Sequence, residues 1–404
     1  MPPLIFYFPY QSVGGVSVLF VLLAGILCKD HEVVLVDLPG GYMKKNLPPG
    51  VGFVSVMDLS TLPENALFVT QTCPPWRIAN NELLSPELRM FFWNLHPLNM
   101  QPNIITFRSR TALGRAIAPF SPVISIFRRM KIKKVLSTFL EHNAIAFMDR
   151  ENVDTTCRIL GREFVPKMLP ICTRKPTKYA LHSMNEVILC AWLGRIEDFK
   201  THVLLHLIKR LDDIAGLKIQ LTIIGSGSGD VQVREAARSL KKLECVFLGT
   251  IDYGHMDEIL SQQDILFAMG TSALEGAKLG LPTFCLDYSF RHVPGLLRFR
   301  MLDEVTGFNL GEEIDERHLE EQSTLETKLR EIKQNPEKFG RRCHDYWERF
   351  HTPERTAESF IRTATESTLT LGKLRTLNLL EPDPMTRMKS CFRDPDPIAG
   401  WQYS

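Results

Sequence analysis

The sequence predicts an α/β protein of two doubly wound domains, each a mostly parallel sheet with helices on both faces. Short apolar runs bounded by turn residues alternate with helical stretches along the chain, which is typical of strands buried in parallel sheets. These runs fall into two series, separated by a segment at 167–178 that is rich in proline and basic residues. The length of 404 residues also exceeds what a single core usually organises.

Ten runs are expected to be strands, five in each series. The first five are 4–10, 33–38, 66–71, 103–107 and 144–149, and the second five are 186–194, 218–225, 245–249, 264–269 and 282–287. We place the first domain at 1–166 and the second at 174–335, and we expect a flexible tail at 372–404, where proline and charge accumulate. Ligands of doubly wound sheets bind beyond the carboxyl ends of the strands, so we expect a central cleft there with both domains facing it.

An apolar stretch at 3–28 has the length of a membrane span or a signal peptide. No basic residue precedes it, and Tyr10, Gln11, Ser12, Gly14 and Gly15 interrupt it. A strand, a glycine turn and a buried helix fit the pattern better than a span.

Composition narrows the class of protein. Hydrophobic residues make up 44% and charged residues 23%, values of an ordinary globular protein, and the net charge of +2 gives no reason to expect nucleic acid as a partner. The nine cysteines form no CxxC pair, which favours reduced thiols in a cytoplasmic protein over disulfides or a zinc site.

A basic pair follows the first strand of the second series. Arg195 comes directly after that strand, and Lys200 lies five residues later. The planar donor fork of arginine and the mobile charge of lysine suit a diphosphate. The alternative is a solvated pair beside Glu197 and Asp198.

Two further turns carry small residues. The segment 224–230 contains Gly225 and can bring backbone N–H groups to an anion, although a plain tight turn needs the same residues. After the strand at 264–269, Gly270, Thr271 and Ser272 can open a helix towards phosphate, and Glu275 follows one turn later. That carboxylate can accept both hydroxyls of a ribose, or it can simply complement the helix dipole.

The first domain offers three weaker candidates. Gly14 and Gly15 lie between the first strand and the first helix, where they permit close approach of a phosphate or sugar or form an ordinary turn. His96 stands in the loop 93–97, where it can contact the donor sugar or transfer a proton, or serve a structural role.

These residues together resemble the retaining GT-B glycosyltransferases of the glycosyl transferases group 1 (family 4) type. The family's GGV loop is similar to 14–16, its GR…K signature to Gly194, Arg195 and Lys200, and its EA-small-x-G-x-P run to 275–282. The resemblance is clear over about 186–290. It implies a GT-B fold and terminal helices at 336–371 that cross back to the first domain.

The resemblance also implies a reaction and roles for residues. A sugar passes with retention from a nucleotide-diphosphate donor to a glycan or lipid-linked acceptor in cell-surface polysaccharide or glycolipid synthesis. The backbone of Thr250 and Ile251 holds the nucleobase, Glu275 binds the ribose, and Arg195 and Lys200 stabilise the leaving diphosphate, so no metal and no cofactor is expected.

One departure from the family keeps two alternatives open. The family often has a second glutamate eight positions before the ribose glutamate, near the donor sugar, and Phe267 stands at that position. A GT-B epimerase of nucleotide sugars and a non-catalytic GT-B-like binding protein therefore remain alternatives.

A basic segment bears on the acceptor. Residues 107–140 contain no acid and eight basic residues, namely Arg108, Arg110, Arg115, Arg128, Arg129, Lys131, Lys133 and Lys134. Its mixture of apolar and basic positions suits peripheral docking of a cytoplasmic protein on an anionic membrane, with a solvated basic face as the alternative.

Overall fold

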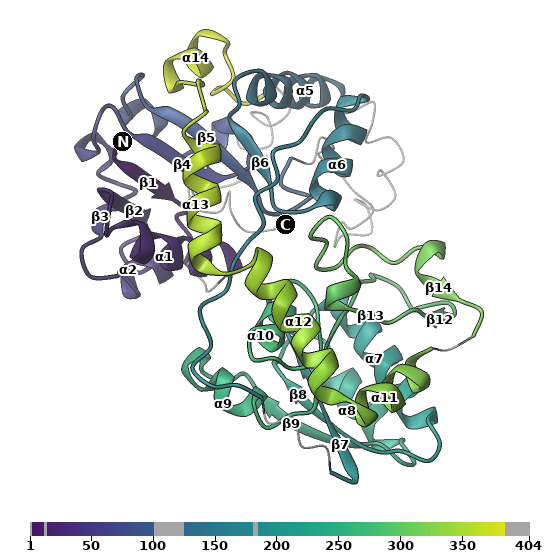
Figure 1. The fold of residues 1–404 in the computed structure, drawn as a ribbon. Helices are drawn as coiled ribbons and strands as arrows, with labels where there is room; N and C mark the ends of the chain where they lie inside the picture. The colour runs from purple at the N-terminus through teal and green to yellow at the C-terminus, as the bar shows by residue number, and fades with distance from the viewer. Residues whose placement is uncertain (1, 12–13, 101–124, 181–184, 323, 384–404) are drawn as a thin grey trace. The chain divides into compact units, whose positions relative to one another are not determined.

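The chain forms two compact units, one made of Met1–Pro170 with the chain from Thr356 onward and one of Ile171–Arg355. The computed structural model describes residues 2–11, 14–100, 125–180, 185–322 and 324–383. Each unit is built on a six-stranded sheet (Figure 1). The prediction of two doubly wound α/β domains is therefore confirmed, while the expected strand at 103–107 lies outside the described residues.

The first unit has an all-parallel sheet in the order β3-β2-β1-β4-β5-β6. Its strands are β1 (Leu4–Tyr7), β2 (Val33–Asp37), β3 (Gly52–Ser55), β4 (Leu67–Gln71), β5 (Arg89–Asn94) and β6 (Ile145–Phe147). Its helices are α1 (Gly15–Leu27), α2 (Tyr42–Lys45), α5 (Ile126–Glu141), α6 (Arg150–Leu160), α13 (Pro353–Ala364, shared with the end of the second unit) and α14 (Leu371–Thr376). The strand order reverses between β1 and β4, which is where ligands of such sheets bind.

Helix α13 completes the core of the first unit. Its Phe360 is fully buried and packs against Phe6 of β1 and against Phe91 and Trp93 of β5, with ring centroids 5.4, 6.0 and 6.1 Å away. Figure 1 shows α13 lying across these strands. Residues from the end of the chain thus cover a face of a sheet built from its beginning.

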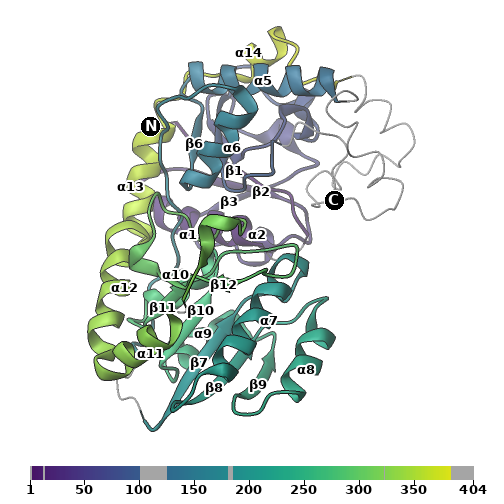
Figure 2. The same cartoon turned by 90° about the vertical axis from the view of Figure 1, so that its right-hand side faces the viewer.

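The second unit has the order β13-β11-β10-β7-β8-β9, parallel except for the antiparallel edge strand β13. Its strands are β7 (Val187–Leu193), β8 (Lys218–Ile224), β9 (Glu244–Gly249), β10 (Ile265–Ala268), β11 (Thr283–Cys285) and β13 (Arg300–Met301), with a small separate pair, β12 (Leu296–Leu297) and β14 (Leu319–Glu320). Its helices are α7 (Asp198–Asp213), α8 (Asp230–Arg238), α9 (Met256–Leu260), α10 (Thr271–Ala277), α11 (Leu325–Gln334) and α12 (Pro336–Phe350). Figure 2 shows α7 and α8 on one side of the sheet and α12 on the other.

The apolar start of the chain forms β1 and then α1, which has 13 residues. No helix among the described residues is long and apolar enough to cross a bilayer. The eight cysteines of the described ranges are all free thiols.

The prediction of a flexible tail at 372–404 was wrong for the first residues of that range. Residues Leu371–Thr376 form α14, because the Thr370 side chain accepts a hydrogen bond from the Lys373 N–H and because Leu371 and Leu374 are buried. Residues 384–404 lie outside the described part of the chain. Within the terminal helices expected at 336–371, α12 ends at Phe350 and α13 begins at Pro353.

Candidate functional site

Three glycines join the carboxyl ends of the strands in the second unit. The Gly194 N–H donates to the carbonyl of Ile224, and the Gly225 N–H donates to the carbonyl of Gly249, at 3.0 and 2.7 Å. Gly225 has φ +128°, and a Cβ atom there would lie 2.1 Å from the Gly194 oxygen. The ends of β7, β8 and β9 are therefore held closer together than any side chain would allow.

The glycines of the turn after β8 allow close packing against the segment after β7. A Cβ atom on Gly227 would lie 2.4 Å from the Ile196 oxygen, and one on Gly229 would lie 2.1 Å from Thr201 Oγ1. The Gly229 N–H donates to Ile196 at 2.9 Å, and the Gly227 N–H donates to Asp230 at 3.1 Å. The N–H groups of Gly225, Gly227 and Gly229 are therefore already taken by protein acceptors, and anion binding by the rest of this turn stays a prediction.

The predicted cations lie at this same edge. Arg195 is exposed just after β7, and Lys200 is half-buried in the first turn of α7. Within the described part of the chain, neither side chain has a hydrogen bond or an ion pair, and Lys200 Nζ lies 5.7 Å from the ring centroid of Phe199. Burial and the nearby Arg195 charge lower the pKa of Lys200 to about 8. The Glu197 charge acts on Lys200 in the opposite direction. Two cations that form no ion pair at a strand edge can attract and hold an anion.

The residues after β9 are accessible to a ligand. Thr250 is exposed and Ile251 is half-buried. The hydroxyl groups of Ser226 and Thr250 lie 2.6 Å apart, which links the turn after β8 to the turn after β9. Both predicted nucleobase-binding positions thus lie beside the glycine turn.

Helix α10 begins next to this edge, but one of its expected donors is occupied. Gly270 adopts φ +64°, and its N–H donates to the carbonyl of Leu310 at 2.5 Å. The prediction that this N–H is free for phosphate is wrong, since the Leu310 segment lies against it. Thr271 and Ser272 occupy the first two positions of the helix, where N–H groups have no partner within the helix.

Glu275 is buried, with 7% of its side chain exposed, and both of its oxygens contact other side chains. The Tyr253 hydroxyl donates to Oε1 at 2.8 Å, and Lys278 Nζ lies 2.6 Å from Oε2. Tyr253 belongs to a 3₁₀ turn, Tyr253–His255, two residues beyond Ile251. The carboxylate expected to bind ribose is therefore covered in this structure.

A charged network behind Glu275 was not predicted from the sequence. Lys278 is fully buried and also lies 2.8 Å from Asp257, itself fully buried. Asp257 accepts hydrogen bonds from the Thr177 N–H and hydroxyl and from the Arg174 guanidinium, at 2.9, 3.0 and 3.5 Å. The spacing of Glu275 and Lys278, three residues apart on a helix, was a signal that could have shown the ion pair.

Phe267 explains the departure from the family pattern. It lies within β10, fully buried, with its ring stacked on Phe284 at 4.8 Å between centroids and edge-on to Phe299 at 6.1 Å. Only Met269 and Gly270 separate β10 from α10. The position eight residues before Glu275 is thus part of the core, where a carboxylate has no access to a ligand.

The three candidates of the first domain lie in the first unit. Gly14 and Gly15 follow β1 at the start of α1, and a Cβ atom on Gly15 would meet nothing within 4 Å. His96 comes two residues after β5, half-buried, and its Nδ1 accepts from the Leu98 N–H at 3.1 Å. Because β1 and β5 are parallel within one sheet, these residues share its carboxyl edge.

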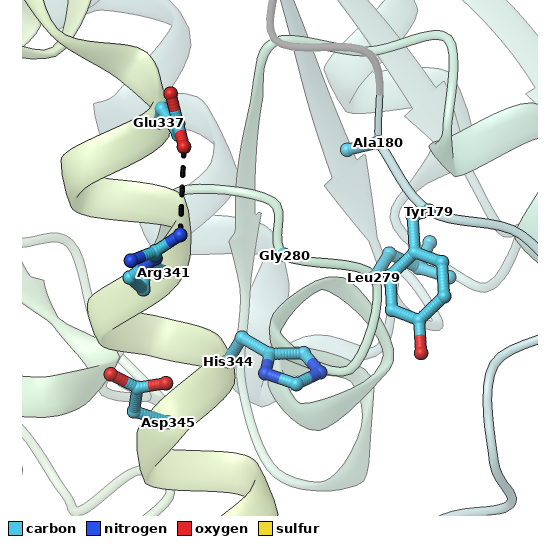
Figure 3. A pocket seen from close by; sticks show the side chains of 8 residues that line it. All are labelled: Tyr179, Ala180, Leu279, Gly280, Glu337, Arg341, His344 and Asp345. Carbon is cyan, nitrogen blue, oxygen red and sulfur yellow. Dashed lines mark ion pairs between the residues drawn. The ribbon is translucent and has the colours of Figure 1, made fainter.

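A cavity of about 290 Å³ in the second unit lies elsewhere. Figure 3 shows its lining, with the His344 ring directed towards Leu279 and Tyr179. Tyr179 precedes β7 and Leu279 precedes β11 along the chain, so this cavity opens at the amino edge of the parallel sheet, opposite to Arg195 and Lys200. It does not belong to the predicted site.

A second buried charged cluster follows β11. Asp287, Glu312 and His318 place possible metal-ligand atoms within 4.8 Å of one another. The Arg300 guanidinium lies among them, 2.5 Å from Asp287 and 3.6 Å from Glu312. An arginine already balances these carboxylates, which fits a structural ion cluster better than a metal site.

Solved structures resemble the chain over nearly its whole length. HepE from Anabaena, in complex with UDP and glucose, has a TM-score of 0.57 at 9% identity and covers 91% of this chain and 100% of its own. A glycosyltransferase from Rickettsia africae has a TM-score of 0.52 at 11% identity, with 94% and 98% covered. WaaG, a glycosyltransferase involved in lipopolysaccharide biosynthesis, has a TM-score of 0.52 at 14% identity, with 88% and 98% covered.

No protein-family model matches the chain, and no curated protein matches its sequence. Identities this low show a shared fold and no more. The two doubly wound units and these structural neighbours together establish that the chain has the GT-B fold.

Proposed function

We propose that this protein is a retaining glycosyltransferase that moves a hexose from a nucleotide-diphosphate donor to a glycan or lipid-linked acceptor. The observation that carries the proposal is the pair Arg195 and Lys200, two cations at the carboxyl edge of a doubly wound sheet whose side chains make no hydrogen bond or ion pair among the described residues. Such an edge is where nucleotides bind in this class of fold.

The pair supplies the chemistry that the reaction needs. Breaking the bond between sugar and phosphate leaves negative charge on the departing diphosphate, and two positioned cations stabilise that charge. Lys200 is well suited to this role. Burial disfavours its charged form and lowers its pKa, so a bound anion stabilises the ammonium group more than it would a solvated one. In this proposal the side chains do what a metal ion does in other enzymes, and no cofactor takes part.

The remaining candidates bind the rest of the donor. The backbone of Thr250 and Ile251 holds the base, Glu275 takes the ribose, and Thr271 and Ser272 face the phosphates. In the first unit, Gly14 and Gly15 leave room for the diphosphate or sugar, and His96 contacts the sugar or carries a proton. HepE was crystallised with UDP and with UDP-glucose, which makes UDP the first nucleotide to test here.

The acceptor side of the proposal depends on α5. Its first turns expose Ile126, Phe127 and Met130, with 51%, 63% and 64% of each residue accessible. Lys133 and Lys134 are exposed on the same helix, whereas Arg128 turns inward, with an ion pair to Asp383 at 3.9 Å. Arg108, Arg110 and Arg115 lie outside the described residues. Exposed apolar side chains beside lysines suit peripheral docking at the cytoplasmic face of an anionic membrane. In this proposal a lipid-linked acceptor is reached there.

The first experiment is thermal unfolding with UDP, GDP, ADP, CMP or buffer. A ligand at a hundred times its Kd adds about 2.7 kcal/mol of stability, so one nucleotide should raise the unfolding midpoint. Arg195→Ala and Lys200→Ala should abolish the rise, while Lys209→Ala, an exposed lysine of the same helix α7, should keep it. If no nucleotide raises the midpoint, the donor site does not exist.

Turnover separates the enzyme from the other two classes. With the donor sugar and an acceptor extract from membranes, we expect transfer with the anomeric configuration of the donor retained, as read by NMR of the product. Release of an altered nucleotide sugar from donor alone would indicate an epimerase. Binding without turnover of any kind would indicate a non-catalytic protein.

Membrane docking has its own test. The protein should sediment with vesicles of phosphatidylglycerol and not with vesicles of phosphatidylcholine alone, and added salt should weaken the binding. Phe127→Ser together with Met130→Ser should reduce sedimentation while leaving nucleotide binding unchanged. Equal sedimentation of this variant and the wild type would exclude α5 as the docking surface.

A further inference from the structure

The carboxylate of Glu275 has no free face in this structure. Its Oε2 atom is inaccessible to solvent beside Lys278, and its Oε1 atom accepts the Tyr253 hydroxyl. A buried carboxylate accepts strongly, so a ligand hydroxyl can reach it only by replacing one of these donors. Lys278 is fully buried and is also held by Asp257, which leaves Tyr253 as the donor that can be exchanged.

Tyr253 stands where its side chain can move. It is half-buried in the 3₁₀ turn Tyr253–His255, next to the exposed residues Asp252 and Gly254. Its ring lies against the Arg174 guanidinium at 4.1 Å. Arg174 is held by hydrogen bonds to the Tyr253 carbonyl and to Asp257, at 2.6 and 3.5 Å. Rotation of the tyrosine side chain would therefore leave both Arg174 and the backbone of the turn in place.

We propose that Tyr253 occupies the ribose position of the donor site, with its phenol hydroxyl on Glu275 in place of a ribose hydroxyl. This inference rests on the proposed function, since it assigns a competitor to the same site. A nucleotide binds only when the Tyr253 side chain leaves Glu275, and a ribose hydroxyl then donates to the Oε1 atom that the phenol has vacated. Tyr253 therefore sets the affinity for the nucleotide and restricts the site to ligands with ribose hydroxyls.

Replacing the Tyr253 hydroxyl by a ribose hydroxyl on Glu275 changes the free energy of nucleotide binding in a predictable way. One hydroxyl–carboxylate hydrogen bond replaces another, so the ribose gains little from Glu275 while Tyr253 competes. Removal of the phenol oxygen alone leaves Oε1 without that donor in the nucleotide-free protein. The ribose hydroxyl then gains a charge-assisted hydrogen bond in full, which corresponds to roughly tenfold tighter binding.

The test compares Tyr253→Phe with wild type by isothermal titration calorimetry, using UDP and 2′,3′-dideoxy-UDP. We expect Tyr253→Phe to bind UDP and the dideoxy nucleotide each about tenfold more tightly than wild type does, because either ligand must displace the phenol, and we expect both proteins to bind UDP more tightly than the dideoxy nucleotide. Tyr179→Phe, an exposed tyrosine of the same unit that lines the cavity at the opposite edge of the sheet, serves as the matched control and should change neither affinity.

The calorimetric results distinguish failure of this inference from failure of the donor site. Weaker or equal binding of UDP by Tyr253→Phe would overturn the inference, because Tyr253 would then position Glu275 for the ribose rather than compete with it. Absence of UDP binding by wild type and Tyr253→Phe alike, with GDP, ADP and CMP equally silent, would overturn the donor site itself. Thermal unfolding of each variant without ligand checks that the second unit is folded.

A second readout is independent of affinity. Fluorine NMR of protein labelled with 3-fluorotyrosine gives one resonance per tyrosine, and the Tyr253→Phe spectrum identifies the resonance of Tyr253. Saturating UDP should shift that resonance as the ring leaves Arg174 and Glu275, and saturating 2′,3′-dideoxy-UDP should shift it as well, because it needs the same displacement. An unchanged resonance at saturation would show that the tyrosine stays on Glu275 and would sink the inference.

Discussion

The carbonyl oxygen of Gly194 lies 2.1 Å from the place that a Cβ atom on Gly225 would occupy. Gly225→Ala must therefore push β7 and β8 apart at their carboxyl ends, in addition to the strain of an alanine at φ +128°. We expect a loss of about 3 kcal/mol in the free energy of unfolding and loss of nucleotide binding, measured by urea unfolding and calorimetry.

Gly249→Ala is the control for that prediction. Gly249 also has a positive φ, +66°, but a Cβ atom there would meet nothing within 4 Å. The loss should be only about 1–2 kcal/mol, from backbone strain alone. Equal losses for the two variants would mean that close approach of the strands is not the reason for glycine at 225.

Lys200 predicts how nucleotide binding depends on pH. Its pKa is about 8 in the free protein, and a bound diphosphate should raise it, since the anion favours the charged form. Affinity should therefore hold steady below about pH 7 and fall as the pH rises above about 8, where binding must first protonate the amine. Calorimetry at pH 8 in two buffers of different ionisation enthalpy should detect uptake of about half a proton.

Lys200→Arg provides the contrast for the pH profile. A guanidinium stays charged throughout this range, so the variant should bind, if more weakly, without the loss above pH 8. A wild-type affinity that stays constant up to about pH 9.5 would show that Lys200 does not meet the diphosphate.

His351 predicts the acid sensitivity of the second unit. It is fully buried, its Nδ1 lies 2.6 Å from the carbonyl oxygen of Ile171, and burial lowers its pKa to about 4. The unfolded chain takes up a proton near pH 6.5, and the folded protein does so only near pH 4. Stability should thus be full above about pH 6.5 and fall as the pH drops, by up to about 3 kcal/mol at pH 4.

Urea unfolding at pH 7 and pH 5 tests this with His351→Phe. The phenyl ring can keep the contacts with Phe308 and Tyr346, while the bond to Ile171 is lost. The variant should be less stable than wild type at pH 7, by about 1 kcal/mol, and should lose less stability between pH 7 and pH 5. An equal loss in both proteins would assign the acid sensitivity to other groups.

Lys278 should be the most costly charge to remove from the second unit. Lys278→Met leaves the carboxylates of Glu275 and Asp257 buried without the amine that lies 2.6 and 2.8 Å from them. Removing one partner of a buried ion pair typically costs about 3–5 kcal/mol. Adding Glu275→Gln should recover part of the loss in chemical denaturation, and a double variant no more stable than Lys278→Met would contradict this account.

The fold was predictable because each strand is a local signal. Runs such as 186–194 and 218–225 are mostly apolar, as is typical of strands buried on both faces, and they form β7 and β8. The edge position of Arg195 and Lys200 follows from the same rule, since loops after parallel strands gather at one edge. Strand β5 (Arg89–Asn94) was missed, because a short apolar run beside a loop has no periodicity that separates strand from helix.

The state of the site was not predictable from the sequence. Glu275 and Tyr253 are 22 residues apart, and their hydrogen bond depends on where the turn after β9 places a single ring. The glycines of the turn after β8 had two interpretations, and only the backbone positions of Gly194 and Ile196 show that they are needed for close packing. Such contacts join distant segments, and propensity and patterning say nothing about them.

The position of Phe360 has a consequence for how the protein is made. A ribosome delivers β1 to β6 long before it delivers α13, so the nascent first unit lacks the aromatic ring that fills the space between Phe6 and Trp93. The second unit, continuous from Ile171 to Arg355, emerges whole and can fold while the first still waits. The second unit can therefore complete its fold before the first does, and until α13 is made the sheet face that Phe360 covers stays apolar and open to chaperones.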